Sequence, residues 1–274
     1  MSIVDEITRL TSAKANIKAA IEAKGVSVPS SAHLDAFPSY VSAISGGGGG
    51  GNWWDAVLGG TWDGVISMNA ASVPTGIAVY LFGMTPSSIP SFTVNLPITT
   101  WIDGWAFSRA GVYSVNAPLV EVVGSSAFAS CSKLVHFSAS RLRYVSSSAF
   151  YSCAKLLSIS SPSMSYLGSG AFYYCYSLQT VRIGDNIDQI SLNRYCFNGC
   201  SALESLYLLA KSSINGARSD YFANTPMVNS ALLGHYGSIY VRASVYSKAL
   251  SSVTFSAVKD RLVSLTDAQI AALP

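Results

Sequence analysis

Charged residues are scarce in this chain of 274 residues, since Asp, Glu, Lys and Arg make up only 11% of it, against roughly 25% in ordinary globular domains. The 17 basic residues outnumber the 14 acidic ones by three, and they form no run that could follow a phosphate backbone. Binding to nucleic acid is therefore not expected. Apolar residues account for 50% of the chain, and their spread through most of the sequence argues against disorder.

Long apolar runs are also missing. No stretch of about 18 apolar residues occurs, so we expect no insertion into a membrane. The opening sequence, MSIVDEITRL, lacks the basic start and apolar core of a secretory signal. We therefore expect synthesis in a cytoplasm, where the five cysteines stay reduced.

Motifs for catalysis and cofactor binding are absent as well. The sequence has no P-loop, no dinucleotide-binding glycine fingerprint, no zinc-protease motif and no nucleophile elbow. Its three histidines have no partners at metal-ligand spacing. We expect no metal, no cofactor and no catalytic residue. Asp185 and Asp188 leave one enzymatic alternative open, a glycosidase carboxylate pair, although a solvated turn between strands explains them better.

The chain does contain a repeat, marked by phenylalanine at steps of 21 to 25 residues. In four units a cysteine follows the phenylalanine by three residues, and a leucine follows the cysteine by three more. The phenylalanines are Phe107, Phe128, Phe150, Phe172, Phe197 and Phe222. The cysteines are Cys131, Cys153, Cys175 and Cys200. Because one unit is too short to bury its apolar side alone, we expect a mainly β solenoid of short parallel strands, with stacked coils of about 22 residues.

Stacking also predicts the environment of the cysteines. Thiols at one repeat position would form a line along the solenoid, which does not fit a tetrahedral metal site. We therefore expect them to be buried as small apolar side chains. Cys196 lies off this position and is the thiol that we expect to be exposed.

The pattern Ala-Phe-x-x-Cys-x-x-Leu-x-x-hydrophobic resembles the BspA-like leucine-rich repeat family over residues 103–214, and more weakly over 80–250. The later segment GSIYVRASVYSKALSSVTFSAVKDRLVSL resembles the ending of such proteins, which implies a strand-helix cap at the C-terminus. Ala110 and Thr225 stand where other units have Cys. Arg242 stands where the family often has Pro, and we expect little to follow from that difference.

These features divide the chain into five parts. Residues 1–45 form an α-helical segment, 46–51 a poly-Gly linker, 52–102 a Trp-rich N-terminal cap with a degenerate first coil, 103–236 the solenoid, and 237–274 the C-terminal cap. All five tryptophans lie between residues 53 and 105. That grouping is typical of a sugar-binding surface or of bulky residues that cap a first coil, and we favour the cap.

The N-terminal segment carries an apolar stripe of helical period. The residues of this stripe, which are candidates for oligomerisation, are Ile3, Ile7, Leu10, Ile17 and Ile21. Three heptads are short for a coiled coil, so packing against its own chain or a neighbour is an equal alternative. Residues 6–44 resemble the N-terminal segment of bacteriophage tail and tail-fibre-type proteins. The resemblance implies a virion protein that binds other tail proteins through residues 1–45 as a homo-oligomer, with a trimer as our expectation.

Candidate recognition residues occupy strand positions that alternate with apolar ones and the turns that follow phenylalanine. Tyrosine and serine dominate these positions, which is typical of recognition surfaces, although tyrosines that merely cover the core explain them equally well. The candidates are His136, Arg143, Tyr144, Tyr151, Tyr166, Tyr173, Tyr174, Gln179, Arg182 and Tyr207.

Together these expectations describe a non-enzymatic phage tail protein, of the tail-fibre or receptor-binding type. Its repeat body would attach to a protein or glycan of the host-cell surface, and several copies per particle would add avidity. Three alternatives stay open: a purely structural baseplate or head-decoration subunit, a bacterial surface adhesin, and a glycan-degrading enzyme.

Overall fold

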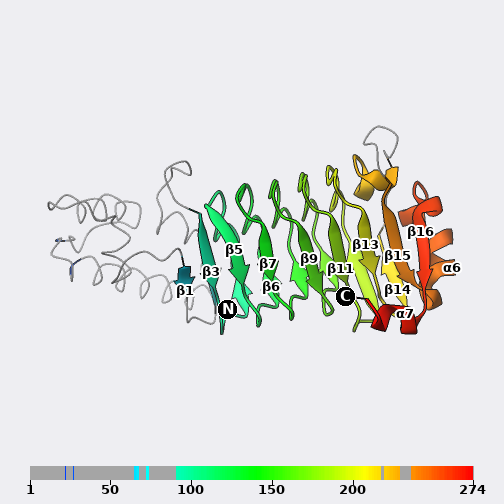
Figure 1. The fold of residues 1–274 in the computed structure, drawn as a ribbon, viewed down its shortest axis with the longest axis horizontal. Coiled ribbons are helices and arrows are strands. Elements are labelled where there is room, and N and C mark those ends of the chain that lie inside the picture. The colour runs from blue at the N-terminus through cyan, green and yellow to red at the C-terminus, as the bar shows by residue number, and fades with distance from the viewer. Residues whose placement is uncertain are drawn as a thin grey trace, which may run out of the picture. The chain divides into compact units, whose positions relative to one another are not determined.

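The computed structural model describes residues 22, 27, 65–67, 72–73, 91–216, 219–228 and 236–273. The chain divides into two compact units, Met1–Gly64 and Val65–Pro274, and the second holds nearly all of the described residues (Figure 1). The predicted helical stripe and the glycine linker lie outside the described residues. The predicted stripe residues concerned are Ile3, Ile7, Leu10, Ile17 and Ile21.

The second unit is a β solenoid, as the repeat predicts. Each coil gives one strand to a front row, whose strands lie side by side in Figure 1. Every pairing along this row is parallel. The front strands are β1 (Val65–Ser67), β3 (Phe92–Asn95), β5 (Val112–Asn116), β7 (His136–Ser138), β9 (Ser158–Ser161), β11 (Thr180–Ile183), β13 (Ser205–Leu208), β15 (Ser238–Arg242) and β16 (Leu262–Leu265).

The second strand of each coil belongs to a back row, which forms one parallel sheet of seven strands. Along both rows, buried side chains tend to alternate with more exposed ones, because successive residues of a strand point to opposite sides. The back strands are β2 (Ser72–Val73), β4 (Trp101–Ile102), β6 (Val122–Val123), β8 (Tyr144–Val145), β10 (Tyr166–Leu167), β12 (Gln189–Leu192) and β14 (Ser213–Asn215).

The repeated phenylalanines form a ladder of stacked rings inside the solenoid. From Phe107 to Phe222, successive ring centroids lie 5.1 to 6.3 Å apart, and neighbouring rings are within 12° of parallel. All six rings are buried. The predicted stacking of the repeat is thereby confirmed.

The repeat-position cysteines form a second buried ladder beside the rings. The thiol of Cys153 donates a hydrogen bond to the carbonyl oxygen of Phe128, one coil earlier, at 3.1 Å. The other three repeat thiols make the equivalent bond at 2.9 to 3.1 Å. Burial raises the pKa of these thiols, and that of Cys131 rises from 9.0 to about 12. The prediction that these thiols are buried core groups is confirmed.

The expectation that Cys196 is exposed is wrong. Its side chain is fully buried, because it directly precedes Phe197 in the position where other coils carry a buried alanine, such as Ala149 and Ala171. A thiol fits there as a somewhat larger apolar group.

Two turn positions of the coils recur in the left-handed region, with φ between 56° and 79°. They lie two residues before and two residues after the phenylalanine. At these positions the backbone N–H points to the next coil: Ser148 N donates to Ser169 O at 2.9 Å, and Ser152 N to Tyr173 O at 2.8 Å. The first position holds Trp105, Ser126, Ser148, Gly170 and Tyr195, and the second holds Arg109, Ser130, Ser152, Tyr174, Gly199 and Asn224.

A strand followed by a helix closes the C-terminal end, as the resemblance implies. The last front strands, β15 and β16, pair with one another and extend the parallel sheet beyond the repeats. The helices of this region are η2 (Ser219–Phe222), α6 (Ala243–Ser251), η3 (Val253–Phe255), η4 (Lys259–Arg261) and α7 (Asp267–Ala271).

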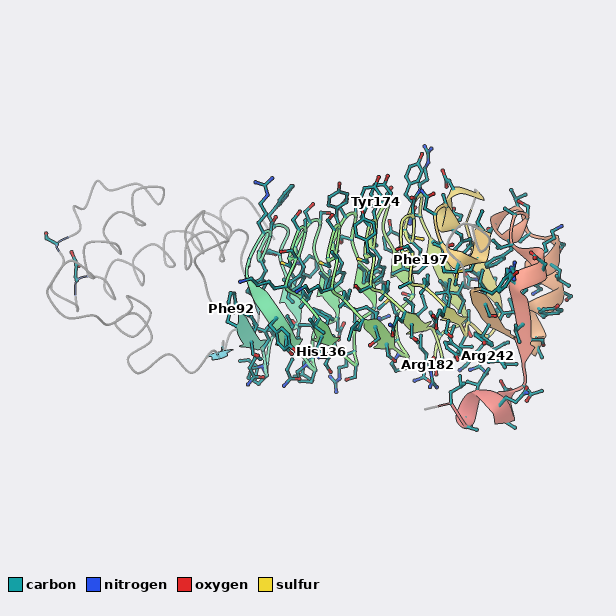
Figure 2. The ribbon with its side chains drawn as sticks, turned by 45° about the horizontal axis from the view of Figure 1, so that its top comes forward. Phe92, His136, Tyr174, Arg182, Phe197 and Arg242 are labelled. Carbon is teal, nitrogen blue, oxygen red and sulfur yellow. The ribbon has the colours of Figure 1, made fainter. Side chains whose placement is uncertain are left out.

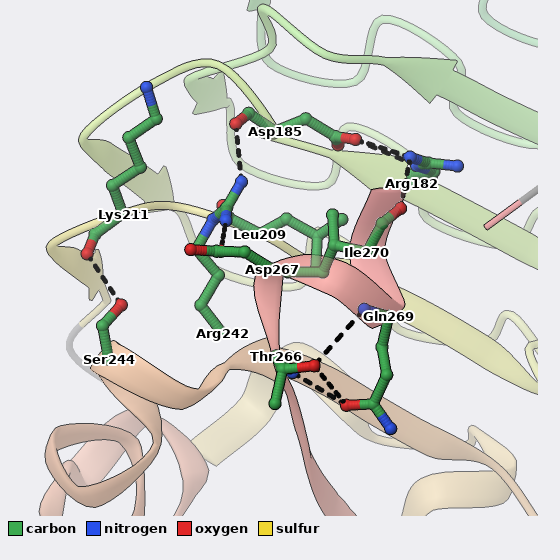
Figure 3. A network of polar contacts seen from close by, with 10 residues as sticks. All are labelled: Arg182, Asp185, Leu209, Lys211, Arg242, Ser244, Thr266, Asp267, Gln269 and Ile270. Atoms are coloured by element: carbon green, nitrogen blue, oxygen red, sulfur yellow. Dashed lines mark hydrogen bonds and ion pairs between the residues drawn. The ribbon is translucent and has the colours of Figure 1, made fainter. Parts of the chain in front are cut away.

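Arg242, the last residue of β15, fastens this cap to the coils, contrary to the expectation that little follows from it (Figure 3). Its guanidinium donates to the carbonyl oxygens of Leu209 at 2.6 Å and of Asp185 at 2.9 Å. It also pairs with the carboxylate of Asp267, the first residue of α7. A proline here would lack all three contacts.

Candidate recognition surface

The ten candidate recognition residues lie on three separate surfaces. In Figure 2, Tyr174 lies at the upper edge of the solenoid, whereas His136 and Arg182 lie along its lower part. We call the outward sides of the two strand rows the front face and the back face. The front face holds His136, Gln179, Arg182 and Tyr207; the back face holds Arg143, Tyr144 and Tyr166; the turns hold Tyr151, Tyr173 and Tyr174.

Small hydroxyl side chains dominate one outward row of the front face. Thr180 pairs in register with Ser158 on one side and Ser205 on the other, and Ser205 pairs with Ser238. Earlier along the row, the exposed imidazole of His136 meets the ring of a neighbouring tyrosine edge-on, with centroids 5.8 Å apart. This face is polar, with little aromatic area over the middle coils.

Two of the front-face candidates hold the C-terminal cap. Arg182 pairs with Asp185 at 2.7 Å and reaches the carbonyl oxygen of Ile270 in α7 at 3.5 Å (Figure 3). Tyr207 stacks on Tyr240 with ring centroids 4.5 Å apart and packs against the apolar cluster beneath α7. Both side chains are half-buried. Their contacts with the C-terminal cap account for these two residues without a role in recognition.

The carboxylate pair considered for a glycosidase does not stand free. One carboxylate oxygen of Asp185 accepts hydrogen bonds from Nε and Nη2 of Arg182, at 3.1 and 2.7 Å. The side chain of Asp185 is only 15% exposed. Asp188 is exposed. The arrangement therefore fits an ion pair that holds the turn after β11. Within the described part of the chain, no cluster of three or more His, Cys, Asp or Glu is placed to hold a metal ion.

The back face carries a row of exposed aromatic rings. Trp101, Val122, Tyr144 and Tyr166 pair in register from β4 to β10, and the three aromatic side chains are 39% to 48% exposed. The rings of Tyr144 and Tyr166 lie 6.2 Å apart. The guanidinium of Arg143 lies 5.8 Å from the Tyr144 ring. The structure thus brings the three back-face candidates together.

An open hollow of about 710 Å³ lies at the C-terminal end of this row. Tyr166 forms one side, and Arg194 forms part of the lining together with polar side chains of β12 and β14. The guanidinium of Arg194 lies 5.0 Å from the Tyr195 ring and 3.5 Å from the carboxylate of Asp220. Arg194 therefore links the hollow to the turns beside it.

A compact group of tyrosines covers the turns of the middle coils. Tyr173 and Tyr174 stack with ring centroids 4.0 Å apart, and Tyr151 lies 5.7 and 6.1 Å from them. Two further rings join the group: Tyr176 stacks on Tyr174 at 5.6 Å, and Tyr195 lies 6.2 Å from Tyr173. We call these five residues the tyrosine ridge.

Sequence reasoning found three members of the ridge and missed Tyr176 and Tyr195. A signal was present, because Tyr176 follows the repeat cysteine directly, where other coils have Gly111, Ser132, Ala154 or Ser201. Tyr195 stands two residues before its phenylalanine, where three other coils have serine or glycine. Large side chains at positions that otherwise hold small ones mark the ridge.

Hydroxyl groups couple two of the ridge tyrosines. The Oη of Tyr173 donates to the Oη of Tyr174 at 3.1 Å. This hydrogen bond, followed by desolvation, raises the pKa of Tyr173 to about 12. Tyr173 therefore keeps its phenolic proton up to strongly alkaline pH.

Two of the five tryptophans fall within the described residues, so the cap that we favoured stays a prediction. Trp101 and Trp105 are 48% and 56% exposed, so these rings face outward on the back face and on a turn. The other three tryptophans lie outside the described residues. In the described ranges no helix has the length and apolar character needed to cross a membrane.

Comparison with known proteins gives a match to one family. The model described as "BspA type Leucine rich repeat region" matches residues 75–204 and 122–250, in six copies. No curated protein matches the chain.

Two solved structures are similar. A leucine rich repeat protein of T. pallidum has 21% identity and a TM-score of 0.36, with coverage of 54% of this chain and 85% of that one. A leucine rich cell surface protein of Faecalibacterium prausnitzii A2-165 has 16% identity and a TM-score of 0.39, with coverage of 74% of this chain and 65% of that one. Because the family matches span well over half of the sequence and the coils stack as that repeat requires, the chain belongs to the BspA type leucine rich repeat family.

Proposed function

We propose that this chain is a non-catalytic attachment protein whose repeat body binds the surface of a bacterial cell. The observation that carries the proposal is the recurrence of exposed or half-buried aromatic rings at equivalent places on neighbouring coils. Tyr144 and Tyr166 pair in register on the back face, and Tyr151 and Tyr173 lie one coil apart on the turns. Tyrosine supplies rigid, amphipathic contact area at low entropic cost.

The solenoid suits this task because it is rigid and elongated along one direction. Each coil contacts mainly its neighbours, so the outward side chains of consecutive coils form continuous rows. A ligand that is itself extended meets several coils at once. Several copies of the chain on one particle would then convert weak single contacts into firm attachment.

The particle that we propose is a phage tail, with residues 1–45 as the segment that binds other tail proteins and forms a homo-oligomer. This assignment rests on the resemblance of residues 6–44 to tail proteins. A bacterial surface adhesin with the same repeat body is the alternative, and its cell surface would take the place of the tail. The two assignments share the binding face and differ in the partner of the N-terminal segment.

Cell binding tests the proposal directly. The labelled full-length chain, incubated with a panel of bacterial strains, is expected to be retained on the cells of some strains and released by excess unlabelled chain. Absence of specific retention on every strain would contradict attachment as the function. A variant that combines Tyr144→Ser and Tyr166→Ser is expected to be retained less than the original chain. Ser138→Ala, a matched change at an exposed residue of the front face, should be retained normally.

Immunogold labelling separates the two particles. Gold on the tails of phage produced by a culture that carries the gene supports the virion assignment. Gold on the envelope of uninfected cells replaces it with the bacterial adhesin, and gold on phage heads replaces it with head decoration.

A further inference from the structure

We propose that the tyrosine ridge, Tyr151, Tyr173, Tyr174, Tyr176 and Tyr195, is a binding site for a neutral saccharide of the cell envelope. This inference rests on the proposed function, because it names the site and the ligand class that attachment would use. It names the turns as the part of the surface that contacts this ligand.

The repeat itself does not require tyrosine at these positions. Where Tyr174 stands, other coils have Ser130, Ser152, Gly199 and Asn224, and only the first coil has another large residue. Where Tyr151 and Tyr173 stand, other coils have small side chains or asparagine. The coils with small residues stack equally well, since their phenylalanines continue the same ladder. The tyrosines are therefore not explained by the fold.

The backbone at two ridge positions is unfavourable for a large side chain. Tyr174 has a φ of 61° and Tyr195 a φ of 58°, a region in which Gly and Asn are tolerated far better than bulky residues. The chain thus keeps two tyrosines where Gly or Asn would be more stable. Conformational cost retained in this way is typical of functional positions.

Gly199 holds the Tyr174 ring in place. A Cβ atom at Gly199 would lie 2.4 Å from Cδ1 of Tyr174, which is closer than two carbon atoms can approach. The ring therefore lies directly over the glycine of the next coil. Tyr174 is positioned by this contact, by Tyr173 and by Tyr176, so its ring is preorganised rather than mobile.

The chemistry of the ridge matches an uncharged, hydroxylated ligand. Aromatic rings offer flat apolar surface to the C–H faces of a sugar, while phenolic hydroxyls donate to and accept from its hydroxyl groups. The ridge residues carry no charge at neutral pH. The cation beside them, Arg194, donates to Tyr195 Oη at 3.0 Å and pairs with Asp220.

Binding of neutral oligosaccharides by the full-length chain tests the site. The probes are labelled oligosaccharides of glucose, galactose, mannose and N-acetylglucosamine, measured by fluorescence polarisation. We expect at least one to bind, and we expect Tyr174→Asn and Tyr195→Gly each to weaken binding by about tenfold, the loss of roughly one ring contact. Gly199→Ala should weaken binding of the same probe, because the added Cβ atom displaces the Tyr174 ring.

A matched control separates loss of the ring from relief of backbone strain. Trp105→Gly removes a large residue from the same left-handed position as Tyr195, far along the solenoid. Both glycine variants should raise the melting temperature, by about 2–4 °C each, but only Tyr195→Gly should lose binding. Equal loss in both would contradict a site at the ridge.

The remaining outcomes are also decisive. If none of the probes binds, or if the ridge variants bind as the original chain does, the saccharide site is wrong. If the chain is still retained on cells, and mild protease treatment of those cells abolishes retention, the receptor is a protein and attachment stands without this site. If cell retention is absent as well, the proposed function itself fails.

Discussion

Phe255 stacks on Phe222 with ring centroids 6.1 Å apart, although Phe255 belongs to the C-terminal cap and to no repeat. The cap therefore supplies a seventh ring to the ladder, and the last coil meets the same kind of neighbour as the inner coils. Phe255 thus covers the ring of Phe222, as the phenylalanine of a further coil would have done.

Removal of one inner ring should destabilise the solenoid strongly. Phe150 lies 5.3 Å from both Phe128 and Phe172 and is fully buried. Phe150→Ala leaves a cavity in a stack that cannot close without moving its coils, so we expect a loss of about 3–5 kcal/mol in the free energy of unfolding by urea. The control Tyr236→Ala, at a residue 69% exposed, should lose less than about 1 kcal/mol. Similar losses would argue against a continuous ladder.

Stability should fall at alkaline pH because of the buried thiols. The pKa of Cys131 rises from 9.0 to about 12 on burial. Below pH 9 both states keep the proton; above it the unfolded chain releases the proton while the folded chain retains it, so the free energy of unfolding decreases as the pH rises from 9 towards 12. We expect a steeper decline in the original chain than in Cys131→Ala, measured by urea midpoints from pH 8 to 10.5. Parallel declines would contradict the contribution of this thiol.

Arg242 should contribute more to the free energy of unfolding than Asp267, the acid that it pairs with. Arg242→Ala removes donors from two carbonyl oxygens and leaves them without this partner, for which we expect about 1–3 kcal/mol. Asp267→Asn removes a carboxylate whose side chain is 85% exposed, and an exposed ion pair contributes about 0–1 kcal/mol. Urea unfolding of both variants measures the difference. The reverse order would mean that the ion pair, and not the carbonyl contacts, secures the cap.

Much of this architecture was predictable from the sequence, because a side chain that recurs at one spacing must meet its own copies when coils stack. The phenylalanine and cysteine ladders follow in this way. The role of Arg242 was not predictable, since its three partners lie 25, 33 and 57 residues away along the chain and meet it only in the folded cap. Tyr195 was missed because it precedes its phenylalanine by two residues, whereas the sequence criterion covered strand positions and the turns that follow phenylalanine.

The left-handed turn positions should discriminate sharply between substitutions of serine. Ser130 has a φ of 60°, where a β-branched side chain clashes with the backbone, so Ser130→Val should cost about 1–2 kcal/mol. Ser138 is exposed in strand β7, where valine is favoured. We therefore expect Ser138→Val to be neutral or slightly stabilising, with both variants compared by thermal unfolding. Equal effects would show that the turn conformation does not limit the choice of residue.

Because the phenylalanines, and in four coils the thiols, meet an equivalent side chain one coil away, the solenoid can change its length without a redesign of its ends. Tandem duplication of the segment 147–168 would insert a unit that both of its neighbours accept. The outer surface would grow by about 4.8 Å with each added strand. The length of the binding surface can therefore change in steps of one coil, through duplication of a short stretch of the gene.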